Sequence, residues 1–160
     1  MVLPLLTRID HVGVACRDLD KTIGLYQATF GLEVVSLEVN EAQGVREAML
    51  GVGAGAPGAG APAGPLAGCA LAGGGYVQLL EPLGPGTPVG KFLARRGEGL
   101  HHIGYGVSDI SEALSAIGGA GIRLIDERPR HGSMGASIAF LHPADLAGVL
   151  TELVQAVSGA

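Results

Sequence analysis

DHVGVACRDL, residues 10–19, is matched 91 positions later by HHIGYGVSDI, residues 101–110. The His, Gly and Asp at the second, fourth and ninth positions are identical, and most apolar positions correspond. Similarity at a fixed offset indicates a repeated structural unit. In each copy an alternating strand leads into an aspartate, Asp18 or Asp109, which suits the N-cap of a following helix. The sequence therefore predicts two copies of one module.

Each copy predicts the same order of elements: a strand, a helix and three further strands. Helices are expected over 19–30 and 110–117, each ended by a glycine, Gly31 or Gly121, in the left-handed conformation of a C-cap. The later strands are expected over 32–39, 44–52, 76–81, 122–125, 136–141 and 149–154. Because half of this chain is too small to bury a good core alone, the halves should pair. The expected fold class is α+β, with two tandem βαβββ modules forming a curved, cup-shaped mixed sheet.

The first copy is longer than the second because it contains an insertion. The last strands, YVQLL (76–80) and LTELV (150–154), match at an offset of 74 instead of 91, so the first copy carries 17 additional residues. Residues 51–75 consist almost entirely of Gly, Ala and Pro with few other types, which favours a surface loop. We expect one domain over 1–160, with module one at about 7–82, including the loop insertion 51–75, and module two at about 99–156.

Composition excludes several classes of protein. The chain is 48% apolar, which is typical of a globular protein, and its net charge of −5 argues against non-specific nucleic-acid binding. It has neither a signal peptide nor a stretch of about 20 apolar residues, so a cytoplasmic location is expected. Cys16 and Cys69 lack the spacing of a zinc or redox motif and are expected to be reduced thiols.

The repeat brings four separated polar residues into equivalent positions. His11 and His102 share one place in the first strands, and Gln78 and Glu152 share one place in the last strands. If a pseudo-twofold axis relates the copies, all four side chains converge. Two imidazoles and two oxygen donors suit a divalent cation, and a six-coordinate ion would keep two positions for a bidentate substrate. Taken singly, each could instead be a hydrogen-bonded core residue or a solvent-facing one. His101, His131 and His142 are assigned no role.

A further carboxylate stands where the other copy is apolar. At the offset of 91, Glu47 aligns with Ile138, and it shares a strand face with Val45 and Met49. Burial among apolar neighbours disfavours ionisation and raises the pKa of a carboxyl group, as a general acid or base near neutral pH requires. The alternative places Glu47 on the outer face, paired with Arg46. The basic run Lys91, Arg95 and Arg96 is typical of a solvated helix face.

Six segments resemble the vicinal oxygen chelate (glyoxalase/bleomycin resistance/dioxygenase) superfamily and, within it, the methylmalonyl-CoA epimerases. They are IDHVGVACRDLD (9–20), LYQATFGLEVV (25–35), EAQGVREAML (41–50), YVQLLEP (76–82), GEGLHHIGYGVSDI (97–110) and SIAFLHPADLAGVLTELVQ (137–155). The resemblance implies that His11, Gln78, His102 and Glu152 are metal ligands and that Glu47 is an active-site carboxylate. It also implies one divalent ion, with Co²⁺ as the first expectation and Mn²⁺, Zn²⁺, Ni²⁺ and Fe²⁺ as alternatives.

The activity implied is interconversion of (R)- and (S)-methylmalonyl-CoA, in propionate metabolism. A proton at C2 would be removed and returned through a metal-stabilised enolate, with Glu47 and Glu152 as the candidate carboxylates. The turn around Gly132-Ser133-Met134-Gly135 could approach the thioester through its backbone. A homodimer and a small acyl-CoA substrate are expected.

Three other functions share this fold. A glyoxalase-like lyase or isomerase would use the same metal chemistry, but the segment EAQGVRE speaks against it. An Fe(II) extradiol dioxygenase would use two His and one carboxylate, and Gln78 as a fourth ligand argues against that. A metal-free, resistance-type binding protein would not need the ligand set.

Overall fold

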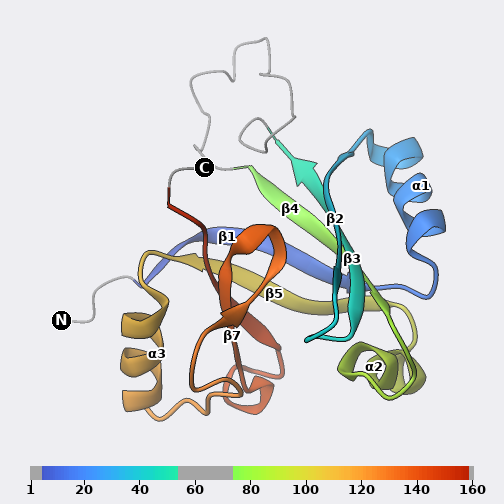
Figure 1. The fold of residues 1–160 in the computed structure, drawn as a ribbon. Coiled ribbons are helices and arrows are strands. Elements are labelled where there is room, and N and C mark those ends of the chain that lie inside the picture. The colour runs from blue at the N-terminus through green and yellow to red at the C-terminus, as the bar shows by residue number, and fades with distance from the viewer. Residues whose placement is uncertain (1–4, 54–73, 159–160) are drawn as a thin grey trace. The chain divides into compact units, whose positions relative to one another are not determined.

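The computed structural model describes residues 5–53 and 74–158 (Figure 1). The chain forms two compact units. One unit runs from His11 to His101, and the other joins the N-terminal segment as far as Asp10 to the chain from His102 onward. Among the described residues, no helix is long and apolar enough to cross a bilayer. The Gly/Ala/Pro-rich insertion lies largely outside the described residues.

The unit from His11 to His101 contains the first copy of the module. Its elements are β1 (Leu6–Ala15, which begins in the other unit), α1 (Leu19–Phe30), β2 (Glu33–Asn40), β3 (Val45–Val52), β4 (Gly75–Pro82) and α2 (Pro88–Arg96). The strands follow the order β2-β3-β4-β1, with β1 parallel to β4 and the other pairs antiparallel. α1 begins after Asp18, whose carboxylate accepts the Lys21 N–H, and ends at Gly31, whose φ of 68° is left-handed. The predicted helix bounds are confirmed.

The other unit repeats this plan. Its elements are β5 (Gly99–Val107), α3 (Ile110–Gly119), β6 (Arg130–His131), β7 (Ser137–Leu141) and β8 (Thr151–Gln155), with short 3-10 turns η1 (Ser133–Gly135) and η2 (Pro143–Asp145). The strand order is β5-β8-β7-β6, with β5 parallel to β8 and β7 antiparallel to it. Asp109 caps α3 as Asp18 caps α1, by accepting the Glu112 N–H. The two caps even share their backbone angles, φ −137° in both.

Strand register confirms the repeat residue by residue. In the first copy Gly13 lies opposite Gln78, and in the second Gly104 lies opposite Glu152. These pairs stand at the offsets of 91 and 74 that the sequence predicts for the first and last strands.

The third strands agree as well. Met49 lies opposite Gln78 where Phe140 lies opposite Glu152. The position of Glu47 is therefore occupied in the second copy by Ile138, as the sequence alignment predicts.

The two faces of the first sheet are covered by different helices. Ala48, Leu50 and Leu79 face α1 and form a buried cluster with Cys16 and Leu19. The opposite face packs against α2, through the cluster Ala15, Val45, Leu80, Val89 and Leu93. By strand alternation, this second face is the one that carries His11, Glu47 and Gln78.

One prediction for the second copy is wrong. The strand expected over 122–125 is replaced by an isolated bridge between Leu124 and Leu141, because the Arg123 N–H bonds to the Asp145 carboxylate instead of a strand partner. The left-handed glycine expected at the end of α3 is confirmed: Gly121, with φ 91°, directly follows the C-cap Ala120, and the Ile122 N–H bonds to the Ile117 carbonyl.

Candidate metal centre and active site

Two polar side chains meet on the inner face of the first sheet. Gln78 on β4 donates its Nε2–H to Glu47 Oε2 on β3 at 2.7 Å. Glu47 is only 1% exposed and Gln78 4%. Because β3 and β4 are antiparallel neighbours, their register sets this contact. The alternative that Glu47 faces outward beside Arg46 is wrong, since Arg46 instead binds Asp20 at 2.7 Å.

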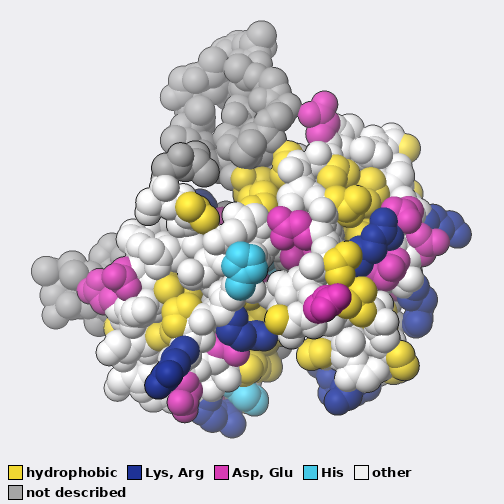
Figure 2. Space-filling model, in the orientation of Figure 1, with side chains coloured by type: hydrophobic (Ala, Val, Ile, Leu, Met, Phe, Trp, Pro, Cys, Tyr) yellow, Lys and Arg dark blue, Asp and Glu magenta, His cyan; other side chains and the backbone are white. Residues whose placement is uncertain are grey.

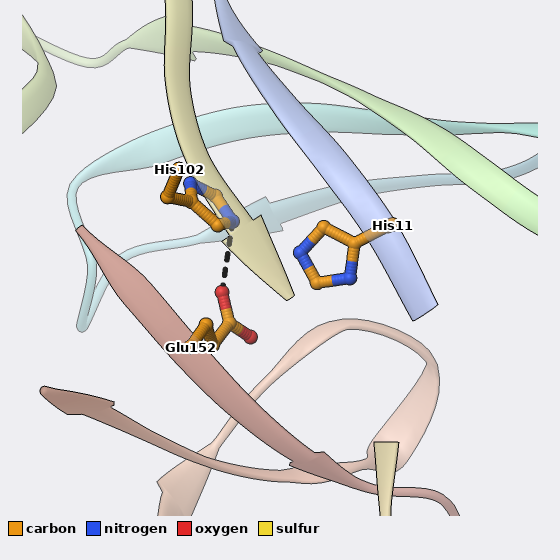
Figure 3. Close-up of side chains that lie close together, drawn as sticks. All are labelled: His11, His102 and Glu152. Atoms are coloured by element: carbon orange, nitrogen blue, oxygen red, sulfur yellow. Dashed lines mark ion pairs between the residues drawn. The ribbon is translucent and has the colours of Figure 1, made fainter. Parts of the chain in front are cut away.

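In the second copy an imidazole and a carboxylate meet, at the positions equivalent to His11 and Gln78. His102 Nε2 lies 2.9 Å from Glu152 Oε2, and both side chains are buried (Figure 3). The Phe140 ring meets the His102 ring edge to face, with centroids 5.5 Å apart. This contact restrains the imidazole so that its Nε2 faces the carboxylate. The atoms that meet, a ring nitrogen and a carboxylate oxygen, are those a cation would take as ligands.

His11 completes a group of metal-ligating type. His11, His102 and Glu152 each offer one ligand atom, and these atoms lie within 4.8 Å of one another (Figure 3). All three side chains are buried. Buried imidazole nitrogens converging with a carboxylate oxygen form a donor set that suits a borderline divalent cation such as Co²⁺ or Zn²⁺. The residues present therefore fit a metal ion.

The remaining histidines lie elsewhere. His101 packs its ring against Phe92, with centroids 4.8 Å apart. His131 is exposed on β6, and His142 uses its Nδ1 to accept the Ala144 N–H at the start of η2.

One buried acid was not predicted. Asp10 immediately precedes His11, is 5% exposed, and binds Arg8 at 2.7 Å. The aligned residue of the second copy is His101, so the repeat carried no signal for it. An acid on a strand, directly before a candidate ligand, was the signal available.

Asp20 and Cys16 are among the side chains outside this group whose pKa values are displaced. The Arg46 guanidinium, by hydrogen bonding, lowers the pKa of the exposed Asp20 carboxyl. Burial raises the pKa of the Cys16 thiol above its ordinary value of 9.0, with smaller contributions from Glu81, Glu98 and Asp18. The thiol stays protonated at neutral pH, as expected for a structural cysteine. Cys69 lies outside the described residues.

Comparison with known proteins identifies the relatives of this chain. A family model described as the glyoxalase/bleomycin resistance protein/dioxygenase superfamily matches residues 10–140. An ethylmalonyl-CoA/methylmalonyl-CoA epimerase of Cereibacter sphaeroides is 32% identical over 153 residues, covering 94% of this chain and 99% of the relative. These matches span both copies of the module.

Solved structures agree with the sequence relatives. A methylmalonyl-CoA epimerase in complex with methylmalonyl-CoA and NH4+ is 48% identical, with a TM-score of 0.83 and 96% of both chains covered. A Streptomyces coelicolor methylmalonyl-CoA epimerase variant in complex with 2-nitronate-propionyl-CoA gives the same identity, TM-score and coverage. The likeness confirms the α+β fold class of two βαβββ modules. The chain therefore belongs to the glyoxalase/bleomycin resistance protein/dioxygenase superfamily and, within it, to the methylmalonyl-CoA epimerases.

Proposed function

We propose that this protein interconverts (R)- and (S)-methylmalonyl-CoA by exchanging the proton at C2. The observation that carries the proposal is the buried Glu47 carboxylate, held by the Gln78 amide at 2.7 Å. It stands in a chain 48% identical to an epimerase whose structure contains methylmalonyl-CoA. The reaction is an isomerisation and needs no electron donor or second substrate.

Glu47 is the residue we assign to proton transfer at C2. Its carboxylate is enclosed by protein, which keeps water from competing for the proton. The Gln78 hydrogen bond fixes the orientation of the carboxylate, so that it can meet the substrate in one geometry. At the position of Glu47 the other copy carries Ile138, so a second proton-transfer group must come from another place. Glu152 is the candidate for it, although ligation would weaken its basicity.

We also propose that His11, Gln78, His102 and Glu152 hold one divalent ion, Co²⁺ first, with Mn²⁺, Zn²⁺, Ni²⁺ or Fe²⁺ as alternatives. The buried group of His11, His102 and Glu152 supports it. Gln78 would contribute its amide oxygen, since its nitrogen donates to Glu47. When bound, such an ion supplies Lewis-acid stabilisation of the negative charge that develops at the thioester carbonyl.

The test is proton exchange at C2 of methylmalonyl-CoA in D₂O, followed by NMR, with metal-loaded and chelator-stripped protein. We expect deuterium to enter only with metal-loaded protein and inversion of C2 to accompany it. Absence of exchange with loaded protein would reject this substrate and favour a glyoxalase-like or binding function. Exchange at full rate in stripped protein would reject the metal alone.

Homodimerisation, a cytoplasmic location and a place in propionate metabolism stay predictions. Light scattering coupled to size exclusion measures the first. Fractionation of cells measures the second, and growth on propionate after deletion measures the third.

A further inference from the structure

Helix α2 carries an exposed basic surface. Lys91, Arg95 and Arg96 are exposed, and the helix sequence PVGKFLARR contains no acidic residue. Figure 2 shows Lys and Arg side chains on the part of the surface where Figure 1 places α2. These are three of only ten Lys and Arg residues in a chain of net charge −5. A basic cluster is thus concentrated on one short helix of an acidic protein.

The cluster is not neutralised within the described part of the chain. Four arginines there are held by acids: Arg8 by Asp10, Arg46 by Asp20, Arg123 by Asp145 and Arg130 by Asp126. No such ion pair involves Lys91, Arg95 or Arg96 in residues 5–53 and 74–158. Lys91 and Arg95 stand one turn apart, where like charges repel. The helix dipole favours Arg95 and Arg96 in the last turn but not Lys91.

α2 lies on the sheet face that carries the site residues. Its Val89 and Leu93 pack on Val45 and Leu80. Val45 is two residues before Glu47 on β3, and Leu80 lies directly opposite Glu47 on β4. Two residues along a strand span about 7 Å. The helix therefore borders the site on one side, within the same unit.

Two contacts fix the helix and its last arginine. Gly90 packs so closely against the backbone of Gly84 that an added Cβ would lie 2.3 Å from the Gly84 carbonyl oxygen. This close contact holds the first turn of α2 in place. Arg96 lies over the Phe92 ring at 6.0 Å, and Phe92 packs against His101. A guanidinium restrained in this way loses less rotamer freedom when it binds an anion.

We propose that Lys91, Arg95 and Arg96 bind the phosphate groups of the coenzyme A part of the substrate. The inference rests on the proposed function, because it takes the substrate to be an acyl-CoA. An acyl-CoA has its reacting carbons at one end of a long pantetheine arm and its phosphates at the other. A substrate with C2 at Glu47 must place its phosphates outside the enclosed site, and α2 offers the adjoining cations. They also give an acidic protein a local field that attracts an anion.

The first experiment measures binding without chemistry. Isothermal titration compares CoA, 3′-dephospho-CoA and pantetheine on the wild type, on Lys91→Gln/Arg95→Gln and on Arg96→Gln. The matched control is Lys21→Gln/Arg128→Gln, which removes two exposed cations that lie outside α2. We expect the Kd of CoA to rise about tenfold in the α2 double variant and to be unchanged in the control. Pantetheine binding should be the same in all.

The second experiment compares methylmalonyl-CoA with methylmalonyl-pantetheine as substrates. The α2 double variant should raise KM for the CoA thioester about tenfold, with kcat retained, and have no effect on the pantetheine thioester. Equal effects on both substrates, or equal Kd values in α2 and control variants, would overturn the assignment. Normal CoA binding by an inactive wild type would instead reject the proposed epimerisation, so the two failures are distinguishable.

Discussion

The Gln78 side-chain nitrogen donates to Glu47 Oε2 at 2.7 Å, and both residues are buried. In the second copy, the residue equivalent to Gln78 is Glu152, which lies 2.9 Å from His102. The same strand position, Gln78 in the first copy and Glu152 in the second, therefore contacts a carboxylate in one copy and an imidazole in the other. We propose two roles for Gln78, as a metal ligand and as a hydrogen-bond donor to Glu47, and mutation can separate them.

Replacing Gln78 by Glu should separate these roles. Glu keeps an oxygen ligand but has no N–H to donate, so we expect metal binding to persist while C2 exchange falls. Leaving a buried polar group without its donor costs about 1–3 kcal/mol, which corresponds to a fall of about 5- to 150-fold in rate. Gln78→Leu should lose both properties. Metal content by plasma mass spectrometry and exchange by NMR decide between the roles, and full exchange in Gln78→Glu would contradict the positioning role.

Glu47→Gln should abolish epimerisation while leaving the metal bound. The amide fills the same volume but cannot take a proton, and general acid–base catalysis contributes about 10²–10⁴-fold. Exchange at C2 should therefore fall by at least about a hundredfold. Glu41→Gln, at an exposed position, is the control. Normal exchange by Glu47→Gln would remove this residue from the mechanism.

The adjacent histidines provide a matched pair. His102→Ala should lose metal and activity, because it removes one of three converging donors. His101→Ala should keep both, since that ring packs against Phe92. Calorimetric titration with Co²⁺ measures the difference. Equal affinity in the two variants would mean that the ion is held elsewhere.

The two aspartate caps should be energetically equivalent. Asp18→Ala and Asp109→Ala each remove a carboxylate that accepts a backbone N–H, at 3.0 and 2.8 Å. We expect each to lower the free energy of unfolding by about 1 kcal/mol. Urea denaturation followed by circular dichroism provides the values. A loss confined to one variant would show that the repeat is not energetically symmetric.

The Cys16 thiol should react slowly in the folded protein. Its pKa is raised by burial above 9.0, so the reactive thiolate is scarce at pH 8. In a Cys69→Ser background, a disulfide reagent should label Cys16 only after denaturation. Because the folded state holds this proton more tightly, its contribution to stability is complete below pH 9 and is lost as the pH rises through the folded pKa. Fast labelling at pH 8 would contradict the burial.

Most of the fold could be predicted because the repeat provides two readings of one pattern. Asp18 and Asp109 cap the first helix of each copy. Apart from the one over 122–125, the expected strands lie where the alternation of apolar and polar residues predicts them. The failure at 122–125 arose from a tertiary contact, since Asp145 takes the Arg123 N–H. No local pattern encodes a bond between residues 22 positions apart. The extension of the second unit into the N-terminal segment is also a tertiary outcome.

For the site, the repeat predicted positions but not contacts. Alignment of the two copies predicted that Gln78 and Glu152 occupy equivalent strand positions. It also showed that the position of Glu47 is apolar in the second copy. It could not predict that Gln78 and Glu47 would bond, because this depends on the diagonal geometry of two antiparallel strands. Asp10 was missed because its counterpart, His101, is of another chemical type.

The matching registers bear on the origin of the chain. Gly13 opposite Gln78 and Gly104 opposite Glu152 indicate that an ancestral gene encoding one module was duplicated and fused. After the duplication, a residue of one copy was able to change while the equivalent residue of the other copy stayed the same. Position 138 now carries an apolar side chain that fills the interior, while position 47 carries a carboxylate. A symmetric scaffold could in this way evolve chemistry that distinguishes one side of a molecule from the other.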